Sequence, residues 1–223
     1  MQKYKSIKIL YSIDKSKYGT GGAIKKASVM ANTKDILIIN GDTYFDIKIS
    51  DLVKEHYRSN NHITIALKPM INFDRYGYVE RNNDGRIISF AEKNFCKKGF
   101  IDGGVYLIKK SIFSDSLLGK NFSFNNFMVK NIHTLKIGSK VFDNFFWRIV
   151  MKKRTVNQIG AKYTKRFLLL SCSIFFKPCM DYNFIVIFVR INLKSYPNPT
   201  MTIVFFCKIN SSHCVGITKK HFF

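Results

Sequence analysis

Asp42 is the residue of this sequence best placed to do chemistry. It follows the apolar run Ile36-Leu37-Ile38-Ile39 after only Asn40 and Gly41, and such a run is typical of a strand buried on both faces of a parallel sheet. Ligands of open α/β sheets bind outside the carboxyl ends of such strands, and Mg²⁺ prefers one or two carboxylates together with substrate phosphates. The pattern predicts a metal ligand, and the alternative is a turn aspartate that caps the following segment.

A glycine-rich segment, Tyr18-Gly19-Thr20-Gly21-Gly22, precedes a stretch of helical periodicity. Glycines let a backbone approach a ligand closely, and the N–H groups at a helix N-terminus favour anions. The segment matches neither GxxxxGK[ST] nor GxGxxG, because Ile24 occupies the last glycine position of the second pattern. A tight strand-to-helix turn is therefore the alternative to a ligand-binding loop.

Two further short motifs contain residues that could contact a sugar phosphate. Glu92-Lys93 joins an acid and a base that could hydrogen-bond a sugar and its phosphate, and the alternative is a solvated surface pair. Asp102-Gly103-Gly104 places two glycines at the entry of a predicted strand, where a ligand could approach the backbone. A simple turn is the alternative for this second motif.

Several function classes lack any support in the sequence. The five histidines are scattered without an HExxH pattern, and no Gly-x-Ser-x-Gly motif indicates a hydrolase. No RNP or zinc-finger pattern occurs, so nucleic-acid binding would rest on charge alone. The cysteines of the last third, Cys172, Cys179, Cys207 and Cys214, are separated by six residues within each pair, which matches no usual zinc spacing.

The elements that must position these residues alternate between strands and helices, which favours an α/β domain with a mainly parallel sheet. A hairpin is predicted over 76–90, because Asp84-Gly85 supplies the positive φ angles that a tight hairpin turn requires. The remaining predicted elements are strands at 7–11, 36–39, 63–67, 104–108 and 135–141 and helices over 23–31, 49–59 and 110–118.

Composition divides the chain into two parts. Of 223 residues, 46% are hydrophobic and 15% aromatic, enough to bury a core. The formal charge is +23, which favours binding of phosphates or anionic surfaces. Residues 151–223 hold 12 basic side chains and a single acid, Asp181, whereas soluble domains mix both signs. The predicted parts are residues 1–146 and an irregular, basic, poorly ordered tail over residues 147–223.

The tail contains apolar segments that are too short to cross a membrane. Phe167–Phe176 spans ten residues, and Lys177 and Asp181 separate it from Phe184–Val189. No signal peptide is recognised at the start, where Lys residues alternate with apolar ones, and the cysteine count is odd. We therefore expect no membrane span and a reducing, cytoplasmic location.

The order of the motifs resembles the sugar-phosphate nucleotidyltransferase family, and within it the branch of D-glycero-α-D-manno-heptose 1-phosphate and mannose-1-phosphate guanylyltransferases. The resemblance covers roughly residues 5–146. It rests on Gly19-Thr20-Gly21-Gly22-Ala23, Asn40-Gly41-Asp42-Thr43-Tyr44-Phe45, Tyr76-Gly77-Tyr78-Val79-Glu80, Ala91-Glu92-Lys93 and Gly103-Gly104-Val105-Tyr106. It implies a Rossmann-like fold.

The resemblance also implies a reaction. Family members join a sugar 1-phosphate to the α-phosphate of a nucleoside triphosphate, here expected to be GTP, and release pyrophosphate in polysaccharide precursor synthesis. Mg²⁺ is the implied cofactor, and positioning and electrostatics dominate the catalysis. The hairpin and its neighbouring strands would form a lid over the sugar. The implied roles are catalysis, metal binding and nucleotide binding for Asp42, nucleotide binding for Gly21 and Gly22, and sugar-phosphate binding for Gly77, Glu92, Lys93 and Gly104.

Two departures from the family pattern lead to further expectations. No GGxGTR or Pro-Lys-Pro segment occurs, so the expected sheet is incomplete, without its first strand and phosphate loop. Where the family has a second metal carboxylate, this chain has Arg148, and acids then become rare. We hypothesise a reading-frame shift near Phe146, which the DNA across that codon tests. Because several groups that act as a unit are missing, we expect turnover by this chain to be near zero.

Two alternatives to an enzyme-family fragment remain. One is a non-catalytic protein that keeps the sugar-phosphate pocket and binds anions. The other is a basic protein that binds nucleic acid or a membrane surface through residues 150–223, which salt-dependent binding would reveal. Because motif order is more specific than bare charge, the expected partners are the nucleotide and the sugar 1-phosphate, without nucleic acid.

Overall fold

The computed structural model describes residues 2–4, 7–13, 18–114, 118–148, 184–192 and 200–208. The helices are α1 (Gly19–Ser28), α2 (Ile49–Arg58) and α3 (Phe124–Lys130), with one 3₁₀ turn, η1 (Lys110–Phe113). The strands are β1 (Gln2–Tyr4), β2 (Ile7–Ile13), β3 (Asp35–Asn40), β4 (Thr43–Phe45), β5 (Ile63–Phe73), β6 (Tyr78–Arg81), β7 (Ile87–Phe90), β8 (Cys96–Lys109), β9 (Ile137–Val141), β10 (Phe146–Arg148), β11 (Phe184–Asn192) and β12 (Thr200–Lys208).

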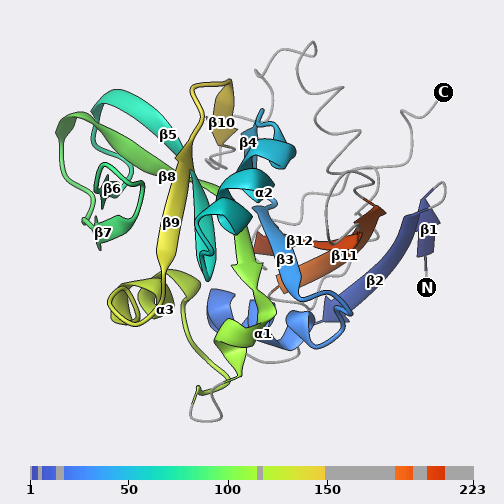
Figure 1. Ribbon diagram of the computed structural model, residues 1–223. Coiled ribbons are helices and arrows are strands. Elements are labelled where there is room, and N and C mark those ends of the chain that lie inside the picture. Colours follow the sequence, from blue (N-terminus) through green and yellow to red (C-terminus); the bar gives the residue numbers. More distant parts are fainter. Residues whose placement is uncertain are drawn as a thin grey trace, which may run out of the picture.

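One large sheet dominates the described part of the chain (Figure 1). Its order is β1-β2-β11-β12-β3-β8-β5-β9, and β6 and β7 extend from β8, while β4 and β10 form a separate pair. The β3–β12 and β5–β9 pairs are parallel and the other described pairs are antiparallel. The predicted α/β class is confirmed, but the sheet is mixed rather than mainly parallel. The reason is that β8 returns from β5 through a hairpin arm without a crossover helix, so it runs antiparallel between β3 and β5.

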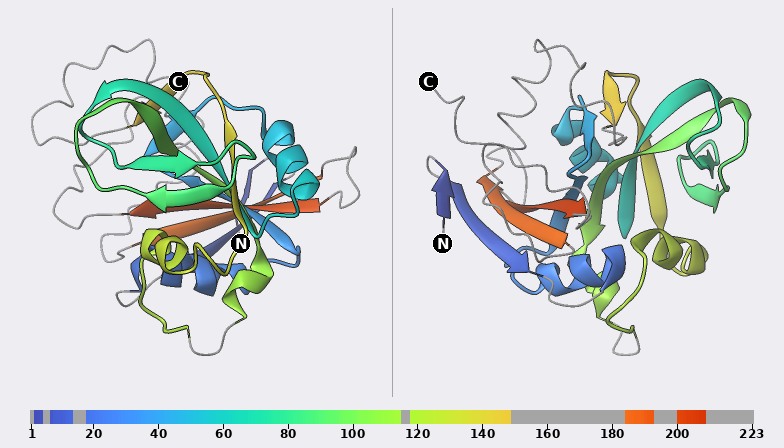
Figure 2. Two further views of the ribbon diagram at one scale, coloured as in Figure 1. Left: turned by 60° about the vertical axis from the view of Figure 1, so that its left-hand side comes forward. Right: turned by 180° about the vertical axis from the view of Figure 1, so that it is seen from behind.

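Alternating side chains of β3 separate two cores on opposite faces of the sheet. Ile36 and Ile38 belong to the core under α1 and α3, whereas Leu37 belongs to the core under α2. Figure 2 shows these helices on opposite sides of the sheet. All three side chains are fully buried, which explains why the sequence of this strand is a continuous apolar run. The turn after β3 is therefore held between two packed layers.

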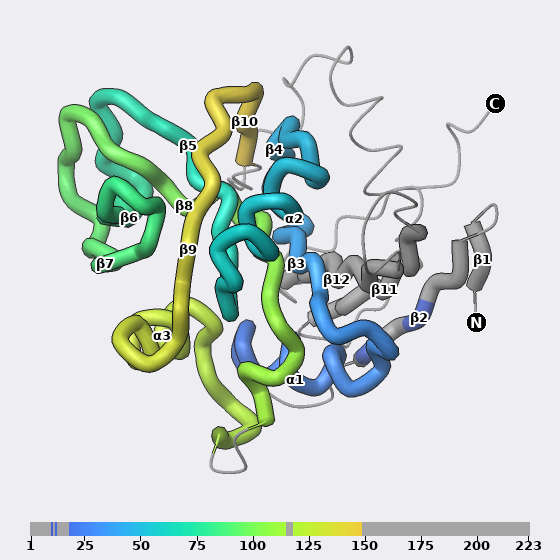
Figure 3. Tube along the Cα trace, in the orientation of Figure 1, coloured from blue at the N-terminus to red at the C-terminus, as the bar shows by residue number. Residues whose placement is uncertain are grey.

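The long strands β5 and β8 differ from the short strands that the sequence predicts. Both continue beyond the core into an arm that carries β6 and β7, as the tube in Figure 3 shows. The helix predicted over 110–118 is wrong for residues 110–114 and 118, the described part of that range, where Lys110–Phe113 form a 3₁₀ turn instead. Ile112 and Phe113 are buried in the core beneath α3, which holds this segment against the domain. Helix α3 and the pair β4–β10 were not predicted.

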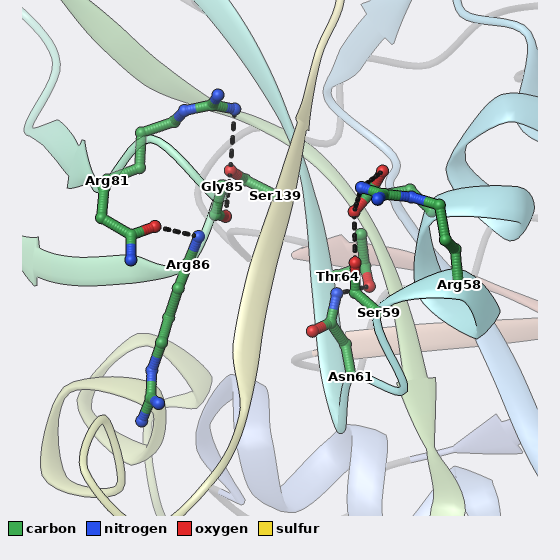
Figure 4. A network of polar contacts seen from close by, with 10 residues as sticks. Arg58, Ser59, Asn61, Thr64, Arg81, Gly85, Arg86 and Ser139 are labelled. Atoms are coloured by element: carbon green, nitrogen blue, oxygen red, sulfur yellow. Dashed lines mark hydrogen bonds and ion pairs between the residues drawn. The ribbon is translucent and has the colours of Figure 1, made fainter.

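The predicted hairpin is present, with a different turn from the one expected. Gly85 has φ +82°, whereas Asp84 is not among the residues with positive φ. The Gly85 N–H donates to the Asn82 carbonyl at 3.0 Å. The hydroxyl of Ser139 on β9 donates to the Gly85 carbonyl at 2.8 Å and accepts from Arg81 at 3.3 Å (Figure 4). The turn of the predicted lid is thus bound to the main sheet.

Two segments of the tail are strands of the main sheet. β11 pairs with β2 and β12, and β12 pairs in parallel with β3, so both lie between β2 and β3. The expectation of an irregular tail is wrong for these two segments. The apolar run Phe167–Phe176 and Cys172, Cys179 and Cys214 lie outside the described residues. The frame-shift hypothesis stays a prediction.

Candidate functional site

Asp42 lies in the turn between the carboxyl end of β3 and the start of β4. Its Oδ1 accepts a hydrogen bond from the Thr43 hydroxyl at 3.0 Å. Its side chain is 47% exposed, so it is open to a ligand. The predicted position at a strand's carboxyl end is therefore observed, and its role as a metal ligand stays a prediction.

Arg148 supplies a cation to this carboxylate. Strand β10 pairs with β4 so that Arg148 lies opposite Thr43, the residue after Asp42. The Arg148 Nε donates to Asp42 Oδ2 at 3.3 Å, and both side chains are about half exposed, at 44% and 47%. The charge inversion that the sequence indicated thus becomes a direct ion pair with the predicted metal ligand.

A second carboxylate, Asp102, lies on β8 and is largely enclosed. Burial raises its pKa. Three effects oppose this only in part: the hydrogen bond from the Tyr106 hydroxyl, the hydrogen bond from the Gly104 N–H, and the charge of Arg148. The Tyr106 hydroxyl donates to Oδ2 at 2.6 Å, and the Gly104 N–H donates to Oδ1 at 2.9 Å. The charge of Arg148, which pairs with Asp42, thus also acts weakly on Asp102.

Gly104 occupies a bulge that bends β8 beside Asp102. The register with β5 shifts between Ile65 and Leu67, and Gly104 has φ +72°. A Cβ at Gly104 would lie 2.8 Å from the side-chain amide nitrogen of Asn40. Glycine is required here by both the backbone conformation and the close packing. The fold thus accounts for this glycine by itself, and the predicted sugar-phosphate role of Gly104 stays a prediction.

The other three residues predicted to bind the sugar phosphate, Gly77, Glu92 and Lys93, lie on the arm. A Cβ at Gly77 would lie 2.6 Å from the Ala91 carbonyl oxygen, so Gly77 lies against the segment that continues into Glu92. Glu92 and Lys93 are both exposed. The ring of Tyr76, next to Gly77, packs edge-to-face on the ring of Phe146 in β10, with 6.3 Å between the ring centroids. The arm therefore packs against β10, which is the strand that carries Arg148.

Gly21 and Gly22 lie within helix α1 and are buried. Both backbone N–H groups donate to the Phe122 carbonyl, at 2.9 and 3.3 Å. A Cβ at Gly21 would lie 2.2 Å from the Phe122 ring, and a Cβ at Gly22 would lie 2.0 Å from the Lys120 carbonyl oxygen. These glycines allow the loop before α3 to pack on α1, and their predicted nucleotide contact stays a prediction.

The sequence interpretation did not assign a role to Asp102 or Tyr106. The signal that could have identified them is a carboxylate inside an otherwise apolar strand, because a charged group is rarely buried there without specific partners. A link also runs from this pair to the glycine segment. The Tyr106 ring contacts Phe124 at 5.4 Å, and the Phe124 N–H donates to the Thr20 hydroxyl at 2.8 Å.

Comparison with known proteins shows to which family this chain is related. The family described as nucleotidyl transferase matches residues 1–135, more than half of the chain. The chain belongs to the nucleotidyl transferase family. This nucleotidyl transferase chain is 44% identical over 140 residues to a D-glycero-alpha-D-manno-heptose 1-phosphate guanylyltransferase of Campylobacter jejuni, and 40% identical over 145 residues to one of Aneurinibacillus thermoaerophilus. The matches cover 63% and 65% of this chain and 61% and 63% of the two relatives.

Solved structures have the same fold. HddC from Yersinia pseudotuberculosis aligns with a TM-score of 0.56 at 26% identity, over 61% of this chain and 59% of HddC. Its complex with GMP-PN aligns with a TM-score of 0.57 at 23% identity, over 73% of this chain and 65% of that one. The family resemblance predicted from the ordered motifs is thereby confirmed.

Among the described residues, no helix is long and apolar enough to span a membrane.

Nucleotidyl transferases generally use a divalent metal ion. The described residues do not fit such an ion well. They contain no group of three or more His, Cys, Asp or Glu side chains that could hold a metal. An ion held by Asp42 and substrate phosphates would also meet Arg148, which already binds Oδ2 of that carboxylate.

Proposed function

We propose that the protein acts on a nucleoside triphosphate and a sugar 1-phosphate, with GTP and a heptose or mannose 1-phosphate as the pair. The reaction joins the sugar phosphate oxygen to the α-phosphorus and breaks that atom's bond to the β-phosphate, so that pyrophosphate leaves. The observation that carries the proposal is the position of Asp42 at the carboxyl end of β3, in a chain 44% identical to a heptose 1-phosphate guanylyltransferase over 140 residues.

Each predicted residue has a role in this proposal. In an active member of the family, Mg²⁺ on the residue equivalent to Asp42 would neutralise charge that develops on the phosphates. In this chain Arg148 already pairs with that carboxylate and opposes the ion. Gly21 and Gly22 are assigned to the nucleotide, and Gly77, Glu92, Lys93 and Gly104 to the sugar phosphate. A cytoplasmic location belongs to the proposal because it would supply both substrates.

Turnover by this chain is expected at background level. Removing one preorganised group from an active site commonly costs about 100–1000-fold in rate, and Arg148 neutralises the proposed metal ligand. The test measures pyrophosphate release from GTP, Mg²⁺ and each sugar 1-phosphate, beside calorimetric binding of GTP and of each sugar phosphate. Binding of both substrate classes supports the proposal, and binding of neither contradicts it.

One observation favours a second candidate function, a non-catalytic protein that binds phosphate-bearing molecules. The Arg148–Asp42 pair places a guanidinium, which recognises phosphate well, where the proposed metal would lie. Binding of inorganic phosphate as tightly as GTP and the sugar phosphates, without any pyrophosphate release, would identify this second function, because the first proposal expects selective binding of the two substrates. Robust release of pyrophosphate would exclude it.

A further inference from the structure

The ion pair between Arg148 and Asp42 is positioned by backbone pairing. Phe146, Trp147 and Arg148 lie opposite Phe45, Tyr44 and Thr43 in the β10–β4 pair. Edge-to-face contacts of the Phe146 ring with Phe45 at 5.3 Å and with Tyr76 at 6.3 Å hold β10 in this register. Arg148 thus projects from a packed strand beside Asp42.

Two nitrogen atoms of the Arg148 guanidinium take no part in the ion pair with Asp42. The pair uses Nε, and among the described residues Nη1 and Nη2 have no hydrogen-bond partner. The side chain is 44% exposed, so these two nitrogens are accessible to a ligand. A guanidinium binds phosphate oxygens through such parallel N–H groups, and its charge does not depend on pH in the ordinary range.

The same charge disfavours a divalent cation. The pair is half exposed, so its own stabilisation is modest. A divalent ion on Asp42 would nevertheless lie within a few ångströms of a guanidinium of the same sign, and the described residues contain no cluster of three or more His, Cys, Asp or Glu side chains to offset that charge. Repulsion at that distance is substantial even in a partly aqueous environment.

We propose that Arg148 takes the place of the divalent cation at Asp42, so that this site binds a phosphate group without a metal ion. The inference rests on the proposed function, which brings phosphate-bearing substrates to the carboxyl end of β3. It assigns Arg148 as a phosphate ligand and Asp42 as the residue that orients it. Replacing Arg148 by a carboxylate should convert the site from an anion site to a cation site.

The first measurement is calorimetric binding of inorganic pyrophosphate to the full chain, with EDTA and then with Mg²⁺ present. The expected wild-type affinity is no higher with Mg²⁺ than with EDTA, because Mg²⁺ only withdraws pyrophosphate in solution, and Arg148→Asp weakens it by about tenfold or more. The matched control is Arg86→Asp, which makes the same charge change at an exposed residue of the hairpin turn. Tighter binding with Mg²⁺ than with EDTA, absence of binding, or an equal loss in the control would overturn the proposal.

The second measurement is Mn²⁺ binding, followed by electron paramagnetic resonance of the free ion. Arg148→Asp is expected to bind Mn²⁺ about thirtyfold more tightly than the wild type, because a positive neighbour becomes a second carboxylate. The double variant Asp42→Asn with Arg148→Asp should lose that gain. If circular dichroism shows that Arg148→Asp does not fold, Arg148→Gln replaces it, with the same directions and smaller changes.

These readouts separate the inference from the proposed function. Equal Mn²⁺ affinities for the wild type and the Arg148 variant would overturn the assignment of Arg148, even if GTP and sugar phosphates bind. Conversely, if pyrophosphate and Mn²⁺ behave as expected while GTP and the sugar phosphates do not bind, the site is confirmed and the proposed function is wrong.

Discussion

The hydroxyl of Tyr106 donates a 2.6 Å hydrogen bond to Oδ2 of Asp102, four residues earlier in the same strand. In a regular strand, residues four apart are separated by about 13 Å along the chain. The bulge at Gly103 and Gly104, with φ +72° at Gly104, bends β8 between them. The bend therefore allows one strand to enclose a carboxylate and supply its partner.

Replacing Asp102 by Asn tests the electrostatic cost of this enclosure. Burial raises the pKa of Asp102 above its usual 3.8, although the hydrogen bonds from Tyr106 and Gly104 oppose the shift. The folded state therefore binds the proton more tightly than the unfolded state, so stability decreases as the pH rises from 3.8 through the folded pKa. Asp102→Asn is expected to be more stable than the wild type at pH 7, and urea unfolding at pH 4 to 8 measures this.

Tyr106→Phe is the complementary variant for the same pair. It removes the donor and leaves the enclosed carboxylate less well satisfied, with an expected loss of about 1–3 kcal/mol at pH 7. A stabilising Tyr106→Phe together with a destabilising Asp102→Asn would show that the carboxylate is not held as the structure describes.

Asp35 gives the opposite pH dependence. Burial raises its pKa, but the His56 ring 3.8 Å from Oδ1, the 2.7 Å hydrogen bond from the Tyr57 hydroxyl and the charge of Lys109 together lower it further, so the net shift is downward from 3.8. Its stabilisation is therefore present above pH 3.8 and is lost as the pH falls through the folded pKa. Asp35→Asn should cost about 1–3 kcal/mol at pH 7, with the difference from wild type shrinking in acid.

The control for Asp35 is Asp51→Asn in helix α2. Asp51 lies 3.9 Å from Lys54 in an exposed pair, so its replacement should change stability by less than about 0.5 kcal/mol. Thermal or urea unfolding across the acid range measures both variants. A pH profile of Asp35→Asn parallel to that of the wild type would contradict the assignment.

Gly22→Ala tests whether the glycine segment serves packing. Alanine in a helix interior normally gains up to about 1 kcal/mol over glycine. At Gly22 the added Cβ would lie 2.0 Å from the Lys120 carbonyl oxygen, and a backbone atom cannot move away cheaply. We expect a net loss of about 1–3 kcal/mol in unfolding free energy.

Gly21→Ala and Gly119→Ala complete that series. The Cβ of Gly21→Ala would meet a side-chain ring, which can shift, whereas that of Gly119→Ala would meet no atom within 4 Å. The expected order of destabilisation is therefore Gly22, then Gly21, with Gly119 nearly neutral. Weaker GTP binding by Gly21→Ala at unchanged stability would instead favour the nucleotide role predicted for this glycine.

Val204→Pro tests the place of β12 in the sheet. β12 has strands on both sides, with residue 204 opposite Ile38 in β3 and Phe188 in β11. Each interior N–H of β12 therefore faces a neighbour, and proline removes one donor, at an expected cost of about 1–3 kcal/mol. Hydrogen exchange of the β3 amides should accelerate, whereas Thr200→Pro at the first residue of the strand should leave it unchanged. Unaltered exchange in Val204→Pro would place β12 outside the sheet.

The sequence by itself determined the strands and helices with a clear apolar pattern and the order of the motifs. The apolar run before Asp42 predicted β3, and the spacing of Leu52, Val53 and His56 predicted α2, because burial on a defined face imposes a period that local sequence records. The position of Asp42 directly after a buried strand followed from the same reasoning. The ordered motifs were sufficient to indicate the family.

The tertiary structure alone decided which residues meet. Arg148 pairs with Asp42 across 106 positions, and Phe122 packs directly on Gly21 although the two are far apart in the sequence. The insertion of β11 and β12 beside β3 could not be inferred from the tail either. Periodicity reports whether a residue faces a core, but partners distant in sequence are chosen by strand register and by the packing of whole layers, which no local pattern encodes.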